Sequence, residues 1–153
     1  MDRGEHLLDA LGAVMNKKRT LDRNEWKAAA QDLNPTELLC VEYVGQHASV
    51  NSTRLAEALC ITTGAASKLT KRLLTKGILL RYQKPENQKE VFFRLTESGE
   101  RLYEILSGIR KKLNQRDQPV FDRLSDDQYE TILDFTRGYS EHLDRLLRRG
   151  GER

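Results

Sequence analysis

The spacing of apolar residues divides the chain into long helical stretches and two short alternating stretches. Residues 5–31 carry apolar side chains three or four positions apart, which predicts a helix with a break near Thr20, where basic residues interrupt the pattern. Two more long helices are predicted, one capped by Thr96 that ends before Pro119 and one that opens at Ser125. These patterns are typical of a mainly α-helical protein.

Capping signals predict three shorter helices in the middle of the chain. The tetrapeptide NPTE at 34–37 supplies a cap, a proline in the first turn and a glutamate at the third helical position, so a helix should run from there to about residue 47. Asn51 or Ser52 can cap a short helix that ends at Leu59. Thr62 can cap the third helix, which should end at a glycine.

Two stretches after this third helix alternate with a period of two, as half-buried strands do. Residues 79–84 and 91–95 predict the strands, and the polar residues 85–90 predict the hairpin tip between them. One face of the second strand would carry Val91, Phe93 and Leu95, and the other face Phe92 and Arg94. The expected fold class is therefore mainly α with one small β-hairpin, an α+β arrangement.

The helix that follows Thr62 has a small, polar first half and a basic second half. On a helical wheel one face is apolar, which predicts packing on the preceding short helix, and it holds Ala66, Leu69 and Leu73. The opposite arc holds Gly64, Lys68, Lys71 and Thr75, flanked by Ser67 and Arg72. A helix that enters a DNA major groove needs this division, because small residues allow close approach while hydroxyls and cations reach bases and phosphates.

Positive charge is concentrated in the same part of the chain. The 153 residues carry a formal net charge of +3, but residues 62–89 hold seven cations against one acid, a net charge of +6. The remainder of the chain is therefore close to −3. A basic block on an otherwise nearly balanced protein indicates contact with a polyanion.

A charged helix face opposite an apolar stripe is often no more than a solvated surface. Here a short helix, a tight turn and a small-then-basic helix form a helix-turn-helix, and a hairpin with a lysine-bearing tip follows at once. This combination favours duplex DNA binding. A winged-helix module for protein contact stays the alternative, because a fold does not fix its task, but such a module would not need the basic block.

The segment from Asn34 to Gly99 contains LAEAL, GAASKLTKRLLTKG and RLTESG in this order. With this spacing it resembles the winged helix-turn-helix core of the multiple antibiotic resistance regulator (MarR) family of bacterial transcription factors. The flanking helices resemble the dimerisation region of that family. The resemblance implies three parts, a dimerisation helix at 1–33, a DNA-binding core at 34–99 and dimerisation helices at 100–153.

The resemblance also implies a function, that of a homodimeric regulator bound to a pseudopalindromic double-stranded DNA operator. Recognition helices would enter successive major grooves, and hairpin tips would enter the flanking minor grooves. Many members are repressors released by a small phenolic or lipophilic ligand, by thiol oxidation or by a metal, so the candidate effector is a small aromatic or lipophilic molecule. The family's recognition-helix contacts fall here on Thr63, Ala65, Ser67, Lys68, Lys71 and Arg72.

The hairpin tip departs from the family pattern. Members commonly carry an aspartate and, two residues later, an arginine that enters the minor groove, whereas this chain has Asn87 and Lys89. Lysine keeps the charge but lacks the planar fork of arginine, so we expect a weaker contribution from the wing. We expect Lys84 and Lys89 to bind phosphates together with the cations of the recognition helix. The predicted DNA-binding residues are Thr62, Thr63, Gly64, Ala65, Ser67, Lys68, Lys71, Arg72, Lys84, Asn87 and Lys89.

The sequence offers few residues for sensing an effector. Cys40 and Cys60 lack paired-ligand spacing and are predicted to be two buried or half-buried thiols, with Cys60 the better redox candidate because cations stand near it. The three histidines show no metal-ligand spacing, so no metal site is predicted. Three aromatic residues could line a ligand pocket, although such residues are usually core: Trp26, Tyr43 and Tyr103.

Other classes of protein fit less well. The chain has no Gly-rich phosphate loop, no metal-ligand cluster and no nucleophile beside a base at a recognisable spacing, so we expect neither an enzyme nor a cofactor. The first twenty residues do not resemble a secretory signal, and no apolar run approaches the length that spans a bilayer. We therefore expect a cytoplasmic protein that does not bind membranes.

Overall fold

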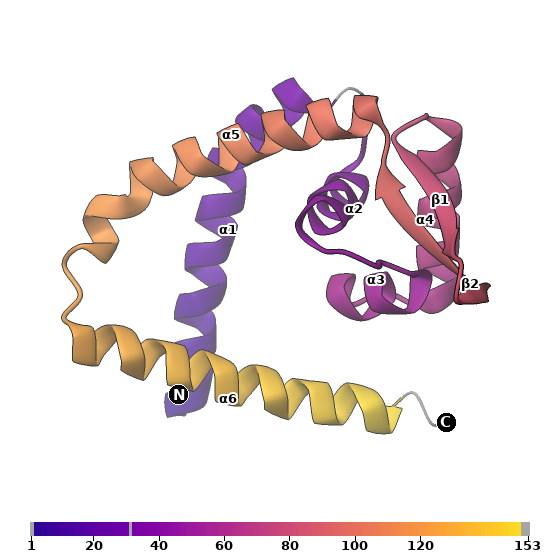
Figure 1. Ribbon diagram of the computed structural model, residues 1–153. Coiled ribbons are helices and arrows are strands. Elements are labelled where there is room, and N and C mark those ends of the chain that lie inside the picture. Colours follow the sequence, from indigo (N-terminus) through magenta and orange to yellow (C-terminus); the bar gives the residue numbers. More distant parts are fainter. Residues whose placement is uncertain (1, 31, 151–153) are drawn as a thin grey trace. The chain divides into compact units, whose positions relative to one another are not determined.

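The computed structural model describes residues 2–30 and 32–150, which form six α-helices and one two-stranded hairpin (Figure 1). The elements, in chain order, are α1 (Arg3–Ala29), α2 (Pro35–Gln46), α3 (Ser52–Leu59), α4 (Thr63–Thr75), β1 (Leu79–Lys84), β2 (Asn87–Leu95), α5 (Glu97–Phe121) and α6 (Asp126–Gly150). The chain divides into two compact units, residues 1–112 and 113–153, and the division falls within α5. The predicted fold class, mainly α with one hairpin, is confirmed.

The core of the first unit lies where α2, α3, α4 and the hairpin meet. Buried side chains from every one of these elements contribute, and the first half of α5 adds more: Leu38, Val41, Val44, Leu55, Leu69, Leu73, Phe93, Leu95, Leu102 and Leu106. Val50, just before α3, accepts a hydrogen bond from the Phe93 N–H at 2.8 Å and joins β2 as an isolated bridge. Helix-turn-helix and wing therefore share one core, which fixes their mutual orientation.

The predicted caps determine where the short helices begin. Glu37 N–H donates to Asn34 Oδ1 at 2.9 Å, and Asn34 N–H donates to Glu37 Oε2 at 3.1 Å, so the capping box of α2 is complete. Asn51 caps α3, since its Oδ1 accepts from the Arg54 N–H at 2.8 Å. The caps predicted for α5 and α6 are also confirmed, at Thr96 and Ser125.

Two predicted interruptions of long helices are wrong. Helix α1 runs through Thr20, whose hydroxyl donates to the Asn16 carbonyl at 2.9 Å, a bond that an unbroken helix accommodates. Helix α5 includes Pro119 and ends two residues later. A proline in the last turn removes one hydrogen bond near an end where carbonyls are already unpaired, so its cost is lower than in a helix interior.

The hairpin is longer than its hydrophobic pattern predicts. Strand β2 starts at Asn87, paired with Lys84, so the tip consists of Pro85 and Glu86 alone and the prediction of a tip over 85–90 is wrong. The first residues of β2 are polar because they extend past the core. Phe92, on the face opposite Phe93, is buried as well and packs beside Tyr82, so each face of β2 has a buried aromatic side chain.

Helix α4 and strand β1 run in opposite directions on either side of a tight turn. Gly77 takes a left-handed conformation (φ +69°), which glycine adopts without strain, and the Ile78 N–H returns to the Leu73 carbonyl at 3.0 Å. The 13 residues of α4 and the six of β1 each span about 20 Å. The hairpin tip therefore returns to the level of the N-terminal end of α4, as Figure 1 shows.

The second unit contains the end of α5 and all of α6. Helix α6 buries none of its residues, yet apolar side chains recur along it at helical spacing, among them Ile132, Phe135, Leu143 and Leu146. Such an uncovered stripe is typical of a helix that packs on a partner. Within the part of the chain that the structure describes, no helix combines the length and apolar character needed to cross a membrane.

Candidate nucleic-acid interface

Helix α4 separates into a buried face and an open face, as its sequence predicts. Leu69 is 1% exposed, and Ala66 and Leu73 are fully buried in the core. Gly64, Lys68 and the other residues of the predicted contact arc lie on the exposed side. The buried face holds the helix in place, and the open face presents small and cationic side chains to an approaching ligand.

The start of α4 is built by the turn before it. Cys60 ends α3 in a left-handed conformation (φ 53°), which lets the Ile61 N–H reach the Ala56 carbonyl at 3.0 Å. The Thr62 hydroxyl oxygen then accepts from the Ala65 N–H at 3.1 Å. Thr62, predicted as a DNA-binding residue, is thus the N-cap of α4. Thr63, Gly64, Ala65 and Ser67 follow it on the exposed surface of the first turns.

A buried carboxylate holds the second half of α4. Glu37, on α2, has a side chain only 2% exposed; its Oε1 accepts from Arg72 Nε at 3.0 Å and its Oε2 from Lys76 Nζ at 2.9 Å. Arg72 and Lys76 lie four residues apart on α4 and are partly exposed. The ion pairs therefore tie α4 to the start of α2. The sequence did not indicate that Arg72 has a partner within the chain.

The charge of Glu37 is favoured by this arrangement. Burial alone would raise the pKa of Glu37, but the hydrogen bonds from Lys76, the Asn34 backbone and Arg72, with the charge of Lys76, outweigh it and lower the pKa. Glu37 is consequently ionised at neutral pH. The two cations that it binds are less available for a phosphate than Lys68 and Lys71, whose side chains make no hydrogen bond or ion pair with the described residues.

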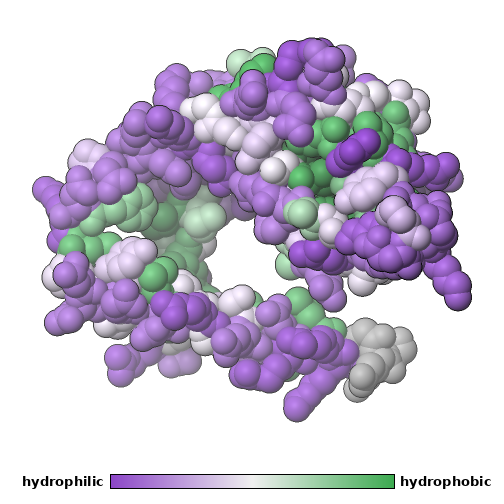
Figure 2. Space-filling view, viewed as in Figure 1, coloured by the Kyte–Doolittle hydropathy of each residue, from purple (hydrophilic) through white to green (hydrophobic). Residues whose placement is uncertain are grey.

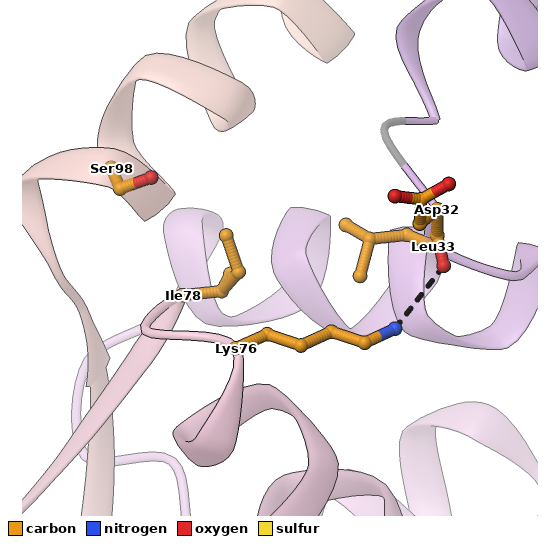
Figure 3. A pocket seen from close by; sticks show the side chains of 5 residues that line it. All are labelled: Asp32, Leu33, Lys76, Ile78 and Ser98. Carbon is orange, nitrogen blue, oxygen red and sulfur yellow. Dashed lines mark hydrogen bonds between the residues drawn. The ribbon is translucent and has the colours of Figure 1, made fainter.

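Lys76 also borders a small pocket at this end of the unit. Its ammonium donates to the Asp32 carbonyl at 3.1 Å, and Figure 3 shows the lysine side chain extended toward that carbonyl. The pocket, about 300 Å³, is lined by Asp32, Leu33, Lys76, Ile78 and Ser98. None of the three aromatic residues predicted to line a ligand site belongs to this lining.

The predicted wing residues differ in how many contacts they make within the chain. Lys84 places its ammonium 4.5 Å from the centre of the Phe92 ring, a cation–π contact that restrains it. Lys89 is exposed. Asn87 shapes the tip, because its Oδ1 accepts from the Lys89 and Glu90 N–H groups, both at 3.2 Å. Figure 2 shows that the surface over the hairpin end is hydrophilic.

Glu90 makes contacts that the sequence did not predict. Its carboxylate accepts one hydrogen bond from Asn51 Nδ2 and another from Asn87 Nδ2, the latter at 2.9 Å. Asn51 is 39 residues away in the chain. No local spacing signals such a pair, so only the folded arrangement of α3 and the hairpin reveals it.

The two cysteines differ in environment. Cys40 is fully buried, and burial raises the pKa of its thiol to about 12, with a further increase from the nearby charge of Glu37. The prediction of a buried thiol is confirmed for Cys40. It is wrong for Cys60, which is exposed because its left-handed position in the α3–α4 turn points away from the core.

The aromatic residues proposed for an effector site pack against the core. Trp26, Tyr43 and Tyr103 are partly buried hydrophobic neighbours of the buried cluster. The Tyr103 ring lies so close to Gly45 that a Cβ there would be 2.4 Å from it, so a larger residue at 45 would force the ring to move. Tyr43 stacks on His47 with ring centroids 4.1 Å apart. Among the residues that the structure describes, no cluster of three or more metal-ligating side chains occurs.

Comparison with known proteins places this arrangement in a family. The family model described as the MarR family matches residues 33–91. The uncharacterized HTH-type transcriptional regulator YvnA of Bacillus subtilis (strain 168) is 31% identical over 105 residues, covering 69% of this chain and 67% of YvnA. The chain belongs to the MarR family. A second uncharacterized HTH-type transcriptional regulator of B. subtilis, YhjH, is 34% identical over 96 residues, and the match covers 63% of this MarR-family chain but only 55% of YhjH.

Solved structures share the fold of this MarR-family chain. FabT of Streptococcus pneumoniae, in complex with DNA, superposes with a TM-score of 0.71 at 15% identity and covers 93% of this chain and 98% of its own. Staphylococcus aureus MarR, in complex with salicylate and kanamycin, gives a TM-score of 0.72 at 17% identity, with 93% of each chain covered. The expected winged helix-turn-helix fold with flanking helices is therefore confirmed.

Proposed function

We propose that this chain is a transcriptional regulator that binds double-stranded DNA in a sequence-specific manner, rather than an enzyme. The observation that carries the proposal is the division of α4, with its apolar face locked in the core and its small and cationic face open. An open helix of this composition fits a major groove, and the net charge of +6 over residues 62–89 favours a polyanion. FabT, which has the same fold, was solved with DNA.

The roles of the side chains follow from their exposure. Thr63, Ala65 and Ser67 in the first turns of α4 read base edges, while Lys68 and Lys71 bind phosphates. The wing adds phosphate or minor-groove contacts through its lysines. Arg72, held by Glu37, acts mainly by fixing α4, although its side chain stays 51% exposed and can also face a phosphate.

The regulator acts as a homodimer on a pseudopalindromic operator. Large apolar side chains are exposed along α1 and α6, and a second subunit is the partner that would cover them. They include Leu7, Leu8, Leu11, Val14, Ile132, Phe135, Leu143 and Leu146. We therefore assign residues 1–33 and 100–153 to dimerisation and 34–99 to DNA binding.

Repression released by a small aromatic or lipophilic effector is the mode of regulation we propose. S. aureus MarR, similar in fold, was solved with salicylate. The pocket would form where Trp26, Tyr43 and Tyr103 border the core. The exposed thiol of Cys60 supports an alternative, release by oxidation. Because a regulator acts in the compartment that holds its DNA, we propose that this protein is cytoplasmic.

Selection from random duplexes at physiological salt tests this function. The protein should enrich a pseudopalindromic sequence and bind it about 10³-fold or more tightly than random DNA. An aromatic acid such as salicylate, and separately peroxide, should then be titrated into the complex to distinguish a ligand from thiol oxidation as the releasing signal. Enrichment of no sequence, with the protein folded and dimeric, would contradict the proposed function.

A further inference from the structure

The wing tip is fastened to the helix-turn-helix by one side chain. Glu90, half-buried on β2, accepts a hydrogen bond from Asn51 Nδ2 through one carboxylate oxygen and from Asn87 Nδ2 at 2.9 Å through the other. Asn51 stands at the start of α3, and Asn87 stands at the hairpin tip. The three side chains, named here the wing bridge, join two segments 39 residues apart.

Each amide of the wing bridge does two things at once. Asn51 caps α3 with its Oδ1, bound to the Arg54 N–H at 2.8 Å, and gives its Nδ2 to Glu90. Asn87 closes the tip with its Oδ1, bound to two backbone N–H groups, and gives its Nδ2 to the same carboxylate. Because both amides have their oxygens occupied, they are oriented to donate to Glu90. The bridge is therefore fixed at both ends.

The position of the bridge determines where the wing cations stand. Strand β1 returns the chain to the level of the N-terminal end of α4, and the tip lies at that end of the unit (Figure 1). A two-stranded hairpin that projects past the core has little to hold its end in place. Lys89 is adjacent to Glu90 in sequence and exposed, so a tip that is held also holds Lys89.

We propose that Glu90 is a positioning residue for DNA binding, which holds the wing tip so that Lys89 meets the same duplex as α4. This inference rests on the proposed DNA-binding function and adds to it a role for an acidic residue within a basic block. Glu90 does not contact DNA in this scheme. Its hydrogen bonds with Asn51 and Asn87 fix the position of Lys89.

Electrostatics alone predicts the opposite effect for the loss of Glu90. Removing a negative charge beside a phosphate backbone should strengthen binding, since fewer like charges face the DNA. If Glu90 positions the wing tip, its loss should instead weaken DNA binding, although a negative charge is removed. Glu86 provides a matched control, because it lies in the same tip, is exposed, and makes no side-chain hydrogen bond or ion pair with the described residues.

The test measures affinity for the enriched duplex at fixed salt for Glu90→Ala, Glu86→Ala and Asn51→Ser. Serine still caps α3 but is too short to keep the bond to Glu90. We expect Glu86→Ala to tighten binding by about twofold, and Glu90→Ala and Asn51→Ser each to weaken it by about fivefold. Lys89→Ala should cost about fivefold in the wild type and less than about twofold in Glu90→Ala.

Lys68→Ala serves as the reference for the recognition helix. Its effect should be the same in the wild type and in Glu90→Ala, which shows that the variant is folded and still docks α4. If Glu90→Ala tightens binding as Glu86→Ala does, or if Lys89→Ala costs the same in both backgrounds, the positioning role is wrong while DNA binding stands. If the wild type binds no duplex above background, the proposed function itself fails.

Discussion

Replacing Glu37 by glutamine is expected to lower the free energy of unfolding by about 2 kcal/mol at pH 7. The carboxylate is 2% exposed and binds Arg72, Lys76 and the Asn34 backbone, and glutamine leaves at least one of these donors unpaired. Breaking a buried pair often costs more, but here both cations are partly exposed and can turn to water. Urea unfolding should be compared at one protein concentration, because a dimer's stability depends on it.

The pH dependence gives this prediction a second readout. The pKa of Glu37 is lowered from its ordinary value of 4.5, so the folded state binds a proton less readily than the unfolded chain. The stabilisation is then complete above the unfolded pKa and is lost as the pH falls through the lower folded pKa. The difference between wild type and Glu37→Gln should therefore shrink on acidification.

Glu97→Gln is the matched control for Glu37. Glu97 pairs with Arg101 at 2.7 Å, but its side chain is 90% exposed, and such a pair contributes less than about 1 kcal/mol. The same chemical change at Glu97 should therefore alter the free energy of unfolding very little. Equal losses at the two positions, or a Glu37→Gln difference that does not change with pH, would show that the buried ion pairs do not stabilise α4.

Placing an aspartate in the apolar stripe of α6 is expected to dissociate the dimer and to weaken operator binding on the order of 100-fold. Leu143 is 41% exposed within one chain, although it lies among other apolar side chains of the stripe. An aspartate at an interface that excludes water must lose its hydration without a partner. A monomer then binds each half-site separately and loses the gain from linked binding.

Leu143→Asp should be compared with Thr131→Asp, which puts the same charge on α6 beside the apolar stripe and not within it. Thr131 is exposed, and its hydroxyl donates to the Asp127 carbonyl of the same helix at 2.7 Å. Sedimentation at micromolar concentration should give a dimer for wild type and Thr131→Asp and a monomer for Leu143→Asp. A monomeric wild type would overturn the assignment of α6 to dimerisation.

Local signals were sufficient to predict most of the fold. Asn34, Asn51, Thr62 and Ser125 cap helices where the sequence places them, because a cap is decided by residues within one turn. The division of α4 is likewise visible in its own periodicity. The break expected at Thr20 does not occur, since a polar stretch on an exposed helix face does not oppose the helix.

The features missing from the sequence prediction depend on distant residues. The partners of Glu37 lie 35 and 39 positions away, and Glu90 meets Asn51 across 39. The spacing of residues along the sequence does not indicate such pairs. These pairs change the description of the site. Arg72 and Asn87, predicted to bind DNA, also make contacts within the chain, and Glu90 becomes part of the site.

The most direct test of the open face of α4 is the salt dependence of affinity for the enriched duplex, measured for the wild type and for Lys68→Ala combined with Lys71→Ala. Each lost phosphate contact should reduce the slope of log affinity against log salt by about one, so the double variant should lose about two. Lys111→Ala, an exposed lysine on α5, should leave the slope unchanged. A double variant with the wild-type slope and affinity would mean that this face does not lie against DNA.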